Sequence, residues 1–465
     1  MDGNAFAALS LLPDVSGLGP SELFYLFIVG AVVLSSFASL LQPFVNLGVT
    51  IFFLVSANTA ILGAHLSAAV AALLIGNCLI GIVLVSGFKV AVERGSLRVP
   101  FLLCAIAALS AVYGFARGNR ASLVLGDFYQ VIEFASLFVL ARMLVKTEQQ
   151  LRTMANVLIG SIVATSVLQM ADALMEASYL ANSHLERQAG PDLLRTINMN
   201  APIAFVALLA ALPVASTKWW LLAGLGLVEI NLILSFTRGL WAATLASTIF
   251  LLILLHHSRV AILKFGFGTG VFAIAFLYVA GLGTVAADRL GFGIQQLRSV
   301  PKDKQILSGR RRLEFTLILP QIAEHPLMGE GLGATYRIAG DAILDGPKGE
   351  IIENHYIHDL YLQVAFRLGV PALLIFLALL WAYFRRSIGN LRASNLSPEN
   401  SALMAGLIAA MFGEVLLSLT SPTFLNHPTA GVIGCIMAMT ITVRRQSRQQ
   451  PARIDIGYAL NKAQS

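Results

Sequence analysis

The sequence predicts an all-α polytopic membrane protein, a bundle of about 12–13 transmembrane helices with one large extracytoplasmic loop containing short helices. Hydrophobic residues make up 57% of the 465 positions and charged residues only 12%, whereas soluble domains carry about 25% charged residues. The apolar runs are about 20 residues long, which is typical of membrane-spanning helices and not of the shorter alternating strands of a membrane barrel.

Thirteen apolar runs are candidate spans: 22–41, 43–65, 67–88, 99–118, 127–145, 151–174, 198–215, 219–236, 237–255, 260–283, 359–384, 397–420 and 424–443. Because the first two are closely spaced, twelve spans fit the pattern as well. The predicted organisation is a mobile N-terminal segment (1–21), a transmembrane bundle (22–283), a large extracytoplasmic loop (284–358), C-terminal transmembrane helices (359–443) and a basic cytoplasmic tail (444–465).

Orientation follows from the basic residues of the short connections, which favour the cytoplasmic side. Those connections alternate along the chain, at Lys89 to Arg98, Lys146 to Arg152, Lys218, His256 to Lys264, Arg385 to Arg392 and Arg444 to Arg448. The opposite side then receives the connection at Arg117 and Arg120, residues 175–197, the turn 236–238 and the long segment 284–358.

Composition argues against several classes of function. The three cysteines, Cys78, Cys104 and Cys435, lie in apolar runs and form no disulfide framework or metal-binding pattern. The net charge of +7 lies largely in short loops, where it reports topology rather than nucleic-acid binding. No basic residue precedes Lys89, so we expect no cleaved signal peptide.

The long segment 284–358 is basic in its first part and acidic in its second. Apolar residues within 313–323 predict a short helix lying on the bundle, kinked at Pro320. Gly329, Gly331 and Gly333 follow no predicted strand and precede no Walker lysine, so we expect no nucleotide site there. A patterned loop of this length is more often functional than a passive connector.

Two basic groups are candidates for binding an anion. Arg238 lies between two apolar runs, and from position alone it either extends to lipid headgroups or faces the bundle interior and binds a phosphate through its planar fork. Arg310, Arg311 and Arg312 form the second group. Helical spacing lets one or two of these three point into a cavity, but not all of them.

His355 and His358 are spaced i, i+3 and would share one face of a helix. No third metal ligand is evident, so we expect no metal. Imidazole can accept a proton from a hydroxyl group near neutral pH, which makes the pair a candidate general base. An ordinary role at the membrane interface is the alternative.

Three acidic residues, Glu133, Glu229 and Glu414, lie in apolar runs. Ionisable residues within the membrane are functional candidates. We expect each to pair with an arginine or to hold two helices together. The alternative is proton coupling in a transporter.

The polar motifs, taken in order, resemble those of the O-antigen ligase and polymerase superfamily. They are Ser308-Gly309-Arg310, then His325-Pro326-Leu327-Met328-Gly329-Glu330-Gly331, then His358-Asp359-Leu360-Tyr361-Leu362. Arg195-Thr196-Ile197-Asn198-Met199-Asn200-Ala201 is similar to the family's Arg…Asn-Pro-Asn region, and Ser235-Phe236-Thr237-Arg238 to its Ser-x-x-Arg turn. The resemblance covers about 195–370, and the earlier spans match only in hydropathy.

This resemblance implies a metal-independent, inverting glycosyltransferase of the bacterial inner membrane, with its active site facing the periplasm and no cofactor. Its donor would be a glycan on undecaprenyl diphosphate, bound among membrane lipids. Arg238 and Arg310 or Arg311 would bind the diphosphate, with Arg195 a weaker candidate. His358 would deprotonate or position the acceptor hydroxyl, flanked by His355, Asp359 and Tyr361 as further substrate-binding candidates. The acceptor stays open between another lipid-linked glycan, lipid A–core and a protein hydroxyl.

Two positions depart from the family pattern. Asp359 stands where Asn is usual, and it either orients His358 or lies away from it. Arg367 stands where an acidic residue is usual, and it adds positive charge near the predicted site. A second class of function is a membrane transporter or flippase for lipid-linked glycans. Transporters often show two-fold repeats, and because no convincing repeat is evident the transferase is favoured.

Overall fold

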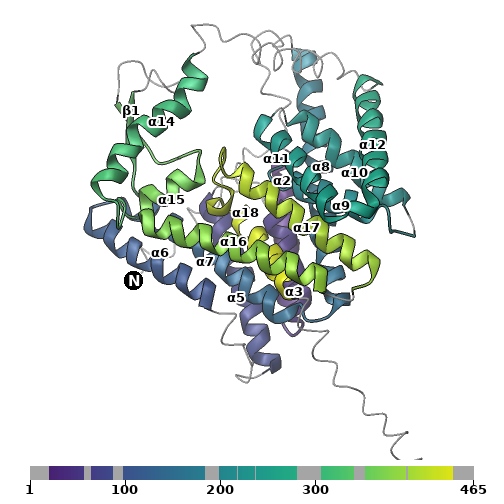
Figure 1. The fold of residues 1–465 in the computed structure, drawn as a ribbon, viewed down its shortest axis with the longest axis horizontal. Coiled ribbons are helices and arrows are strands. Elements are labelled where there is room, and N and C mark those ends of the chain that lie inside the picture. The colour runs from purple at the N-terminus through teal and green to yellow at the C-terminus, as the bar shows by residue number, and fades with distance from the viewer. Residues whose placement is uncertain are drawn as a thin grey trace, which may run out of the picture.

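The computed structural model describes residues 20–56, 64–86, 98–183, 198–216, 218–235, 237–279, 305–339, 351–393 and 396–442. The first ten α-helices among these residues are α2 (Pro20–Ala38), α3 (Pro43–Ser56), α5 (Ala64–Ser86), α6 (Arg98–Ala116), α7 (Ala121–Leu144), α8 (Glu148–Ser183), α9 (Ala201–Ala211), α10 (Trp219–Leu234), α11 (Arg238–Leu254) and α12 (Arg259–Val279). After them come α14 (Gln305–Glu324), β1 (Tyr336–Ala339), β2 (Ile351–Asn354), α15 (Leu360–Leu368), α16 (Val370–Ala393), α17 (Pro398–Leu417) and α18 (Thr429–Thr442). Short 3-10 turns lie at His256–Ser258 and Thr423–Leu425. Figure 1 shows the arrangement.

The centre of the bundle consists of helices that are apolar on every side. Nearly all of α9 and α18 is buried, as expected for helices without a polar face. Helix α17 packs against α9 and α11, and α18 packs against α7. A side chain at Gly434 of α18 would meet the carbonyl oxygen of Phe134 at 2.5 Å, so this glycine permits the close approach of α18 and α7.

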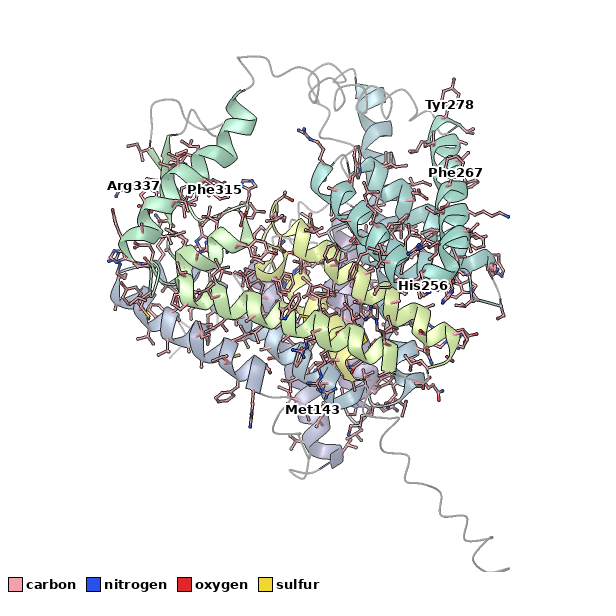
Figure 2. The ribbon with its side chains drawn as sticks, viewed as in Figure 1. Met143, His256, Phe267, Tyr278, Phe315 and Arg337 are labelled. Carbon is pink, nitrogen blue, oxygen red and sulfur yellow. The ribbon has the colours of Figure 1, made fainter. Side chains whose placement is uncertain are left out.

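The periphery of the bundle is also apolar. Phe267 and Tyr278 of α12 project away from the other helices (Figure 2) and are 77% and 75% exposed. Large exposed apolar surfaces of this kind are typical of membrane contact. By length and composition, six of the described helices can cross a membrane, and seven shorter helices are also apolar.

Each of these thirteen apolar helices overlaps one of the thirteen predicted runs. The prediction of an all-α polytopic membrane protein is therefore confirmed. The single span predicted at 359–384 is wrong, because the chain there forms two helices, α15 and α16. Gly369 lies between them in a left-handed conformation (φ 86°) that ends α15.

A small layer formed by α14 and the two strands packs beside α15 (Figure 1). Strand β1 pairs antiparallel with β2, with Tyr336 opposite Asn354, and α14 packs on β1 and α15 around an apolar cluster that includes Ile318, Tyr336 and Phe366. Helix α14 is longer than the predicted helix 313–323 and contains Pro320. The strand pair is a feature that hydropathy did not indicate.

Candidate active site

His358 lies between β2 and α15 and is held by a carboxylate from α14. Its Nδ1 lies 2.6 Å from Glu314 Oε1, and its backbone N–H donates to Glu314 Oε2 at 3.3 Å. The Glu314 side chain is only 2% exposed, whereas that of His358 is 29% exposed. A carboxylate accepts hydrogen bonds, so this contact places the ring hydrogen on Nδ1 and leaves Nε2 as a proton acceptor.

Glu314 is itself held by the strand pair. The Tyr336 hydroxyl lies 3.2 Å from Glu314 Oε1, and the Asn354 amide donates to that hydroxyl at 3.0 Å. The Tyr356 ring meets the His358 ring edge-on, with centroids 4.9 Å apart. This network, in which Glu314 and Tyr336 are buried, fixes the orientation of His358, as a general base requires.

Sequence reasoning did not single out Glu314. A signal was present, because Glu314 lies one and two helical turns before the apolar residues Ile318 and Ile322, which are buried. An acid on the apolar face of a helix needs a partner, since burying an unpaired charge is costly. The partner, His358, lies 44 residues later in the chain. The sequence alone does not identify it, because the contact depends on how the intervening segment folds.

His355 belongs to a different cluster from His358. Its Nε2 lies 3.1 Å from Asp127 Oδ1 on α7, and Arg367 Nη1 donates to the same oxygen at 2.8 Å. The expected shared helical face is wrong, because residues 355–358 are not helical and the two rings turn toward different acids. The expectation that Arg367 adds positive charge to the site is also wrong, because the carboxylate of Asp127 neutralises its buried guanidinium.

The glycine-rich segment after α14 packs against α6. Gly329, Gly331 and Gly333 all have positive φ, and a side chain at Gly331 would meet Gly114 Cα at 2.6 Å. Asn119 donates to the carbonyl oxygens of Glu330 and Leu332 at 3.1 and 2.9 Å. Gly331 and Gly333 allow the chain to pass close to α6 and α7, and Gly329 allows it to pass close to the end of α15.

Salt bridges attach the long segment 284–358 to the turn between α6 and α7. Arg117 pairs with Glu330, and this hydrogen bond raises the pKa of the Arg117 guanidinium above its ordinary value. Arg120 pairs with Glu353 at 3.3 Å, and His325 Nε2 lies 3.6 Å from Glu330 Oε1. The connection at Arg117 and Arg120 therefore lies on the same end of the bundle as the long polar segment.

Arg238 is the first residue of α11 and is exposed. A side chain on its neighbour Gly239 would lie 2.6 Å from Thr420 Oγ1, in the turn that follows α17. The start of α15 contacts this same turn, because Leu360 N–H donates to the Ser418 carbonyl at 2.9 Å. The turn at 418–421 therefore brings Arg238 and His358 to one end of the bundle.

Two predicted substrate-binding residues, Asp359 and Tyr361, make hydrogen bonds to other parts of the protein. Asp359 caps α15, its Oδ1 accepting from Leu362 N–H at 2.9 Å, so Glu314 and not Asp359 holds His358 at Nδ1. The Tyr361 hydroxyl donates to the Val415 carbonyl on α17 at 2.7 Å. Both contacts fasten the start of α15.

The remaining predicted anion ligands are described only in part. Arg195 lies outside the described residues. Arg310 and Arg311 lie within α14, at the fourth and third positions before Glu314, but their side chains lie outside the description.

The three predicted acids, Glu133, Glu229 and Glu414, lie on helices of the packed bundle. Glu133 Oε2 lies 2.8 Å from His427 Nδ1, and Ser67 Oγ lies 2.7 Å from the other ring nitrogen, so α5 and α7 are joined to the segment before α18. Glu229 of α10 lies against Gly270 of α12. Glu414 of α17 is fully buried.

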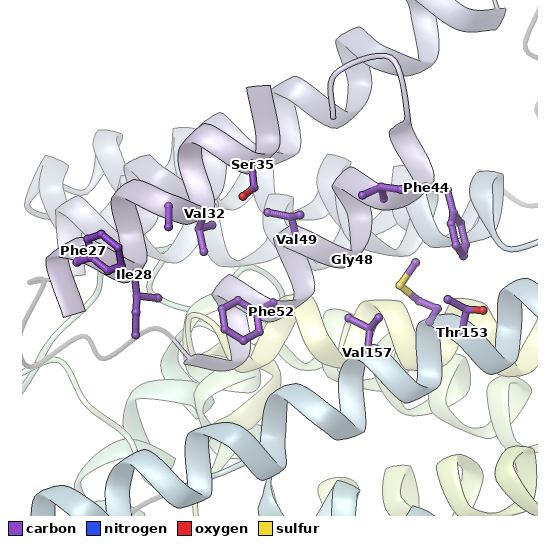
Figure 3. Close-up of a pocket in the computed structure, with 13 residues that line it drawn as sticks. Phe27, Ile28, Val32, Ser35, Phe44, Gly48, Val49, Phe52, Thr153 and Val157 are labelled. Atoms are coloured by element: carbon purple, nitrogen blue, oxygen red, sulfur yellow. The ribbon is translucent and has the colours of Figure 1, made fainter. Parts of the chain in front are cut away.

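A separate apolar cavity of about 600 Å³ lies between α2, α3 and α8 (Figure 3). Its lining includes Phe27, Val32, Phe44, Val49, Phe52 and Val157. None of the candidate site residues lines it, and its lining suits a hydrocarbon chain.

Comparison with known families adds an independent observation. Residues 221–377 match the family model described as O-Antigen ligase. This chain carries an O-antigen ligase domain. The resemblance to the O-antigen ligase and polymerase superfamily is confirmed, and no curated protein matches the chain.

The O-antigen ligase domain contains Arg238, Arg310, Glu314, His358 and Arg367, whereas Asp127 lies outside it. The domain indicates a multi-pass membrane enzyme of the glycosyl-transferring kind, a ligase or polymerase acting on lipid-linked glycan and acceptor substrates.

Proposed function

We propose that this protein transfers a glycan from undecaprenyl diphosphate to an acceptor hydroxyl at the periplasmic face of the bacterial inner membrane, with inversion and without a metal. The observation that carries the proposal is the Glu314–His358 pair, located within an O-antigen ligase domain. Its geometry suits a general base, since one ring nitrogen is held by a buried carboxylate and the other has no hydrogen bond among the described residues.

In the proposed reaction His358 Nε2 takes the proton of the acceptor hydroxyl as its oxygen attacks the anomeric carbon. The bond from that carbon to the diphosphate oxygen breaks, and the electron pair leaves with the diphosphate. Glu314 stabilises the imidazolium that forms. His358 then releases its proton to water, which its partial exposure allows.

The leaving diphosphate gains negative charge as the bond breaks. Arg238 is proposed to stabilise that charge together with Arg310 or Arg311 and, more weakly, Arg195. Fixed guanidinium groups are effective in this role, because they need little reorganisation when the charge develops and interact strongly in a site shielded from water. The position of Arg238 at the start of α11, on the turn shared with α15, supports this role.

The test uses purified protein in nanodiscs with an undecaprenyl-diphosphate oligosaccharide as the sole substrate. A product ladder in wild type that is absent in His358→Ala would identify a polymerase. If no ladder forms, further reactions supplied with lipid A–core and then with an acceptor protein would distinguish a ligase from a protein glycosyltransferase. In liposomes, movement of labelled lipid across the bilayer without any glycan product would favour a transporter and overturn the proposal.

Arg238→Ala should abolish transfer while the protein still inserts and folds. Arg152→Ala is the matched control, because Arg152 forms an exposed salt bridge with Glu399 and should be dispensable. Full activity in Arg238→Ala would remove this residue from the diphosphate site. EDTA should leave transfer unchanged, and a loss that added metal restores would contradict a metal-independent reaction.

A further inference from the structure

Asp127 connects a membrane helix to three separate parts of the O-antigen ligase domain. Its Oδ2 accepts from Gly333 N–H at 2.8 Å, its Oδ1 accepts from Arg367 Nη1 at 2.8 Å, and His355 Nε2 lies 3.1 Å from Oδ1. Asp127 lies on α7, outside the matched range, whereas its three partners lie within it. One carboxylate thus holds the glycine-rich segment, the end of β2 and the last turn of α15.

Arg367 completes this connection. Its Nη2 donates to the His355 carbonyl oxygen, and its own carbonyl accepts from Ser110 Oγ on α6 at 2.9 Å. The side chains of Asp127 and Arg367 are only 6% and 3% exposed. Charges taken out of water to this extent depend on each other, since either one alone would be left buried and unpaired.

The position of His358 follows from these contacts. His355 is held at both its ring and its carbonyl, three residues before His358, and no helix or strand joins the two. Glu314 sets the direction of the His358 ring. The Asp127–Arg367 pair sets where that part of the chain lies on α6 and α7.

We propose that Asp127 and Arg367 are positioning residues, a buried ion pair that docks the segment His355–His358 on the membrane helices and so aligns His358 with the lipid-linked donor. This inference rests on the proposed function. It concerns an ion pair that joins the matched domain to α7, which lies outside the matched range.

A positioning role differs from simple stabilisation in a testable way. An apolar pair of similar size often replaces a buried ion pair without loss of stability. Only an arginine, however, offers a planar fork that reaches Asp127 and the His355 carbonyl together. An apolar pair should therefore restore the fold without restoring the alignment of His358.

The experiment compares Asp127→Asn, Arg367→Lys and the apolar double variant Asp127→Leu/Arg367→Met with wild type in nanodiscs. Arg120→Gln is the matched control, since its salt bridge with Glu353 reaches the same strand pair but is exposed. The measurements are kcat and KM for an undecaprenyl-diphosphate glycan, and hydrogen–deuterium exchange of the backbone over 351–359.

We expect the two single variants to lower kcat about 100-fold, the scale of loss caused by a small misplacement of a catalytic group. KM for the donor should stay within about twofold, because the arginines that bind it are unaffected. Exchange over 351–359 should rise. The double variant should unfold at a higher temperature than either single variant yet remain slow, and Arg120→Gln should match wild type.

Recovery of wild-type kcat in the double variant would overturn the inference, because the pair would then serve stability alone. Unchanged exchange in Asp127→Asn and in the double variant would overturn it as well, since nothing would have been undocked. The exchange measurement does not depend on substrate. If wild type transfers no glycan to any acceptor, the proposed function fails while exchange still decides whether this pair docks the segment.

Discussion

At the scale of single residues, the site depends on a histidine whose partner comes from a separate helix. The carboxylate of Glu314 is buried and bonds both the ring and the backbone of His358. A neutral amide of the same shape would still accept the Nδ1 hydrogen, but it would no longer offset the charge of an imidazolium. The carboxylate therefore matters most when His358 has taken up a proton.

Glu314→Gln should lower kcat about 100-fold, at the lower end of the contribution of general acid–base catalysis, with KM for the donor little changed. Transfer kinetics in nanodiscs would measure this. Glu324→Gln is the matched control, because Glu324 lies at the exposed end of the same helix. Equal kcat in both variants would mean that His358 needs no carboxylate partner.

Asp359 should behave differently from Glu314 because it caps a helix. Asp359→Ala should lower the free energy of unfolding by about 1 kcal/mol, whereas Asp359→Asn should retain most of it, since asparagine is also a good cap. Thermal unfolding in detergent compares the two. A loss of transfer in Asp359→Asn as severe as in His358→Ala would instead indicate that Asp359 works together with the base.

At the scale of elements, the close passage of the glycine-rich segment over α6 is essential for docking the site. Gly331 and Gly118 have nearly the same positive φ, 84° and 82°. A side chain at Gly331 would meet α6 at 2.6 Å, whereas one at Gly118 would meet nothing within 4 Å. Substitutions at these two glycines therefore distinguish the cost of backbone strain from the cost of a steric clash.

Gly118→Ala should lower the free energy of unfolding by about 1–2 kcal/mol, the typical cost of a non-glycine residue in this conformation. Gly331→Ala should cost more than this, because the neighbouring backbone must also move. Denaturation in detergent measures both. Equal losses would show that α6 yields easily and that the close approach is unimportant.

Hydropathy predicted the helices well because the lipid environment selects for apolar runs of fixed length. It failed at Gly369, where an apolar run continues although the helix ends. The contacts of the site were harder to predict, since Asp127 and Arg367 lie 240 positions apart. No local pattern indicates such a pair. Glu314 was identifiable as a buried acid but not as the partner of His358.

At the scale of the whole molecule, salt bridges identify the two ends of the bundle. Arg120 pairs with Glu353 before the start of α7. Beyond the other end of that 24-residue helix, Arg152 pairs with Glu399, and Glu148 accepts from Asn400 at 2.8 Å. A helix of this length extends about 36 Å, enough to cross the bilayer. The connection at Arg152 and the site therefore lie at opposite ends of α7.

This polarity predicts which side of the membrane each end faces. In a background with Cys78, Cys104 and Cys435 replaced by alanine, Arg120→Cys should react with a membrane-impermeant maleimide applied from the periplasm. Arg152→Cys should react only after the membrane is opened, because basic connections stay in the cytoplasm. The reverse pattern would place His358 and Arg238 on the cytoplasmic side, and a donor presented in the periplasm could not reach them.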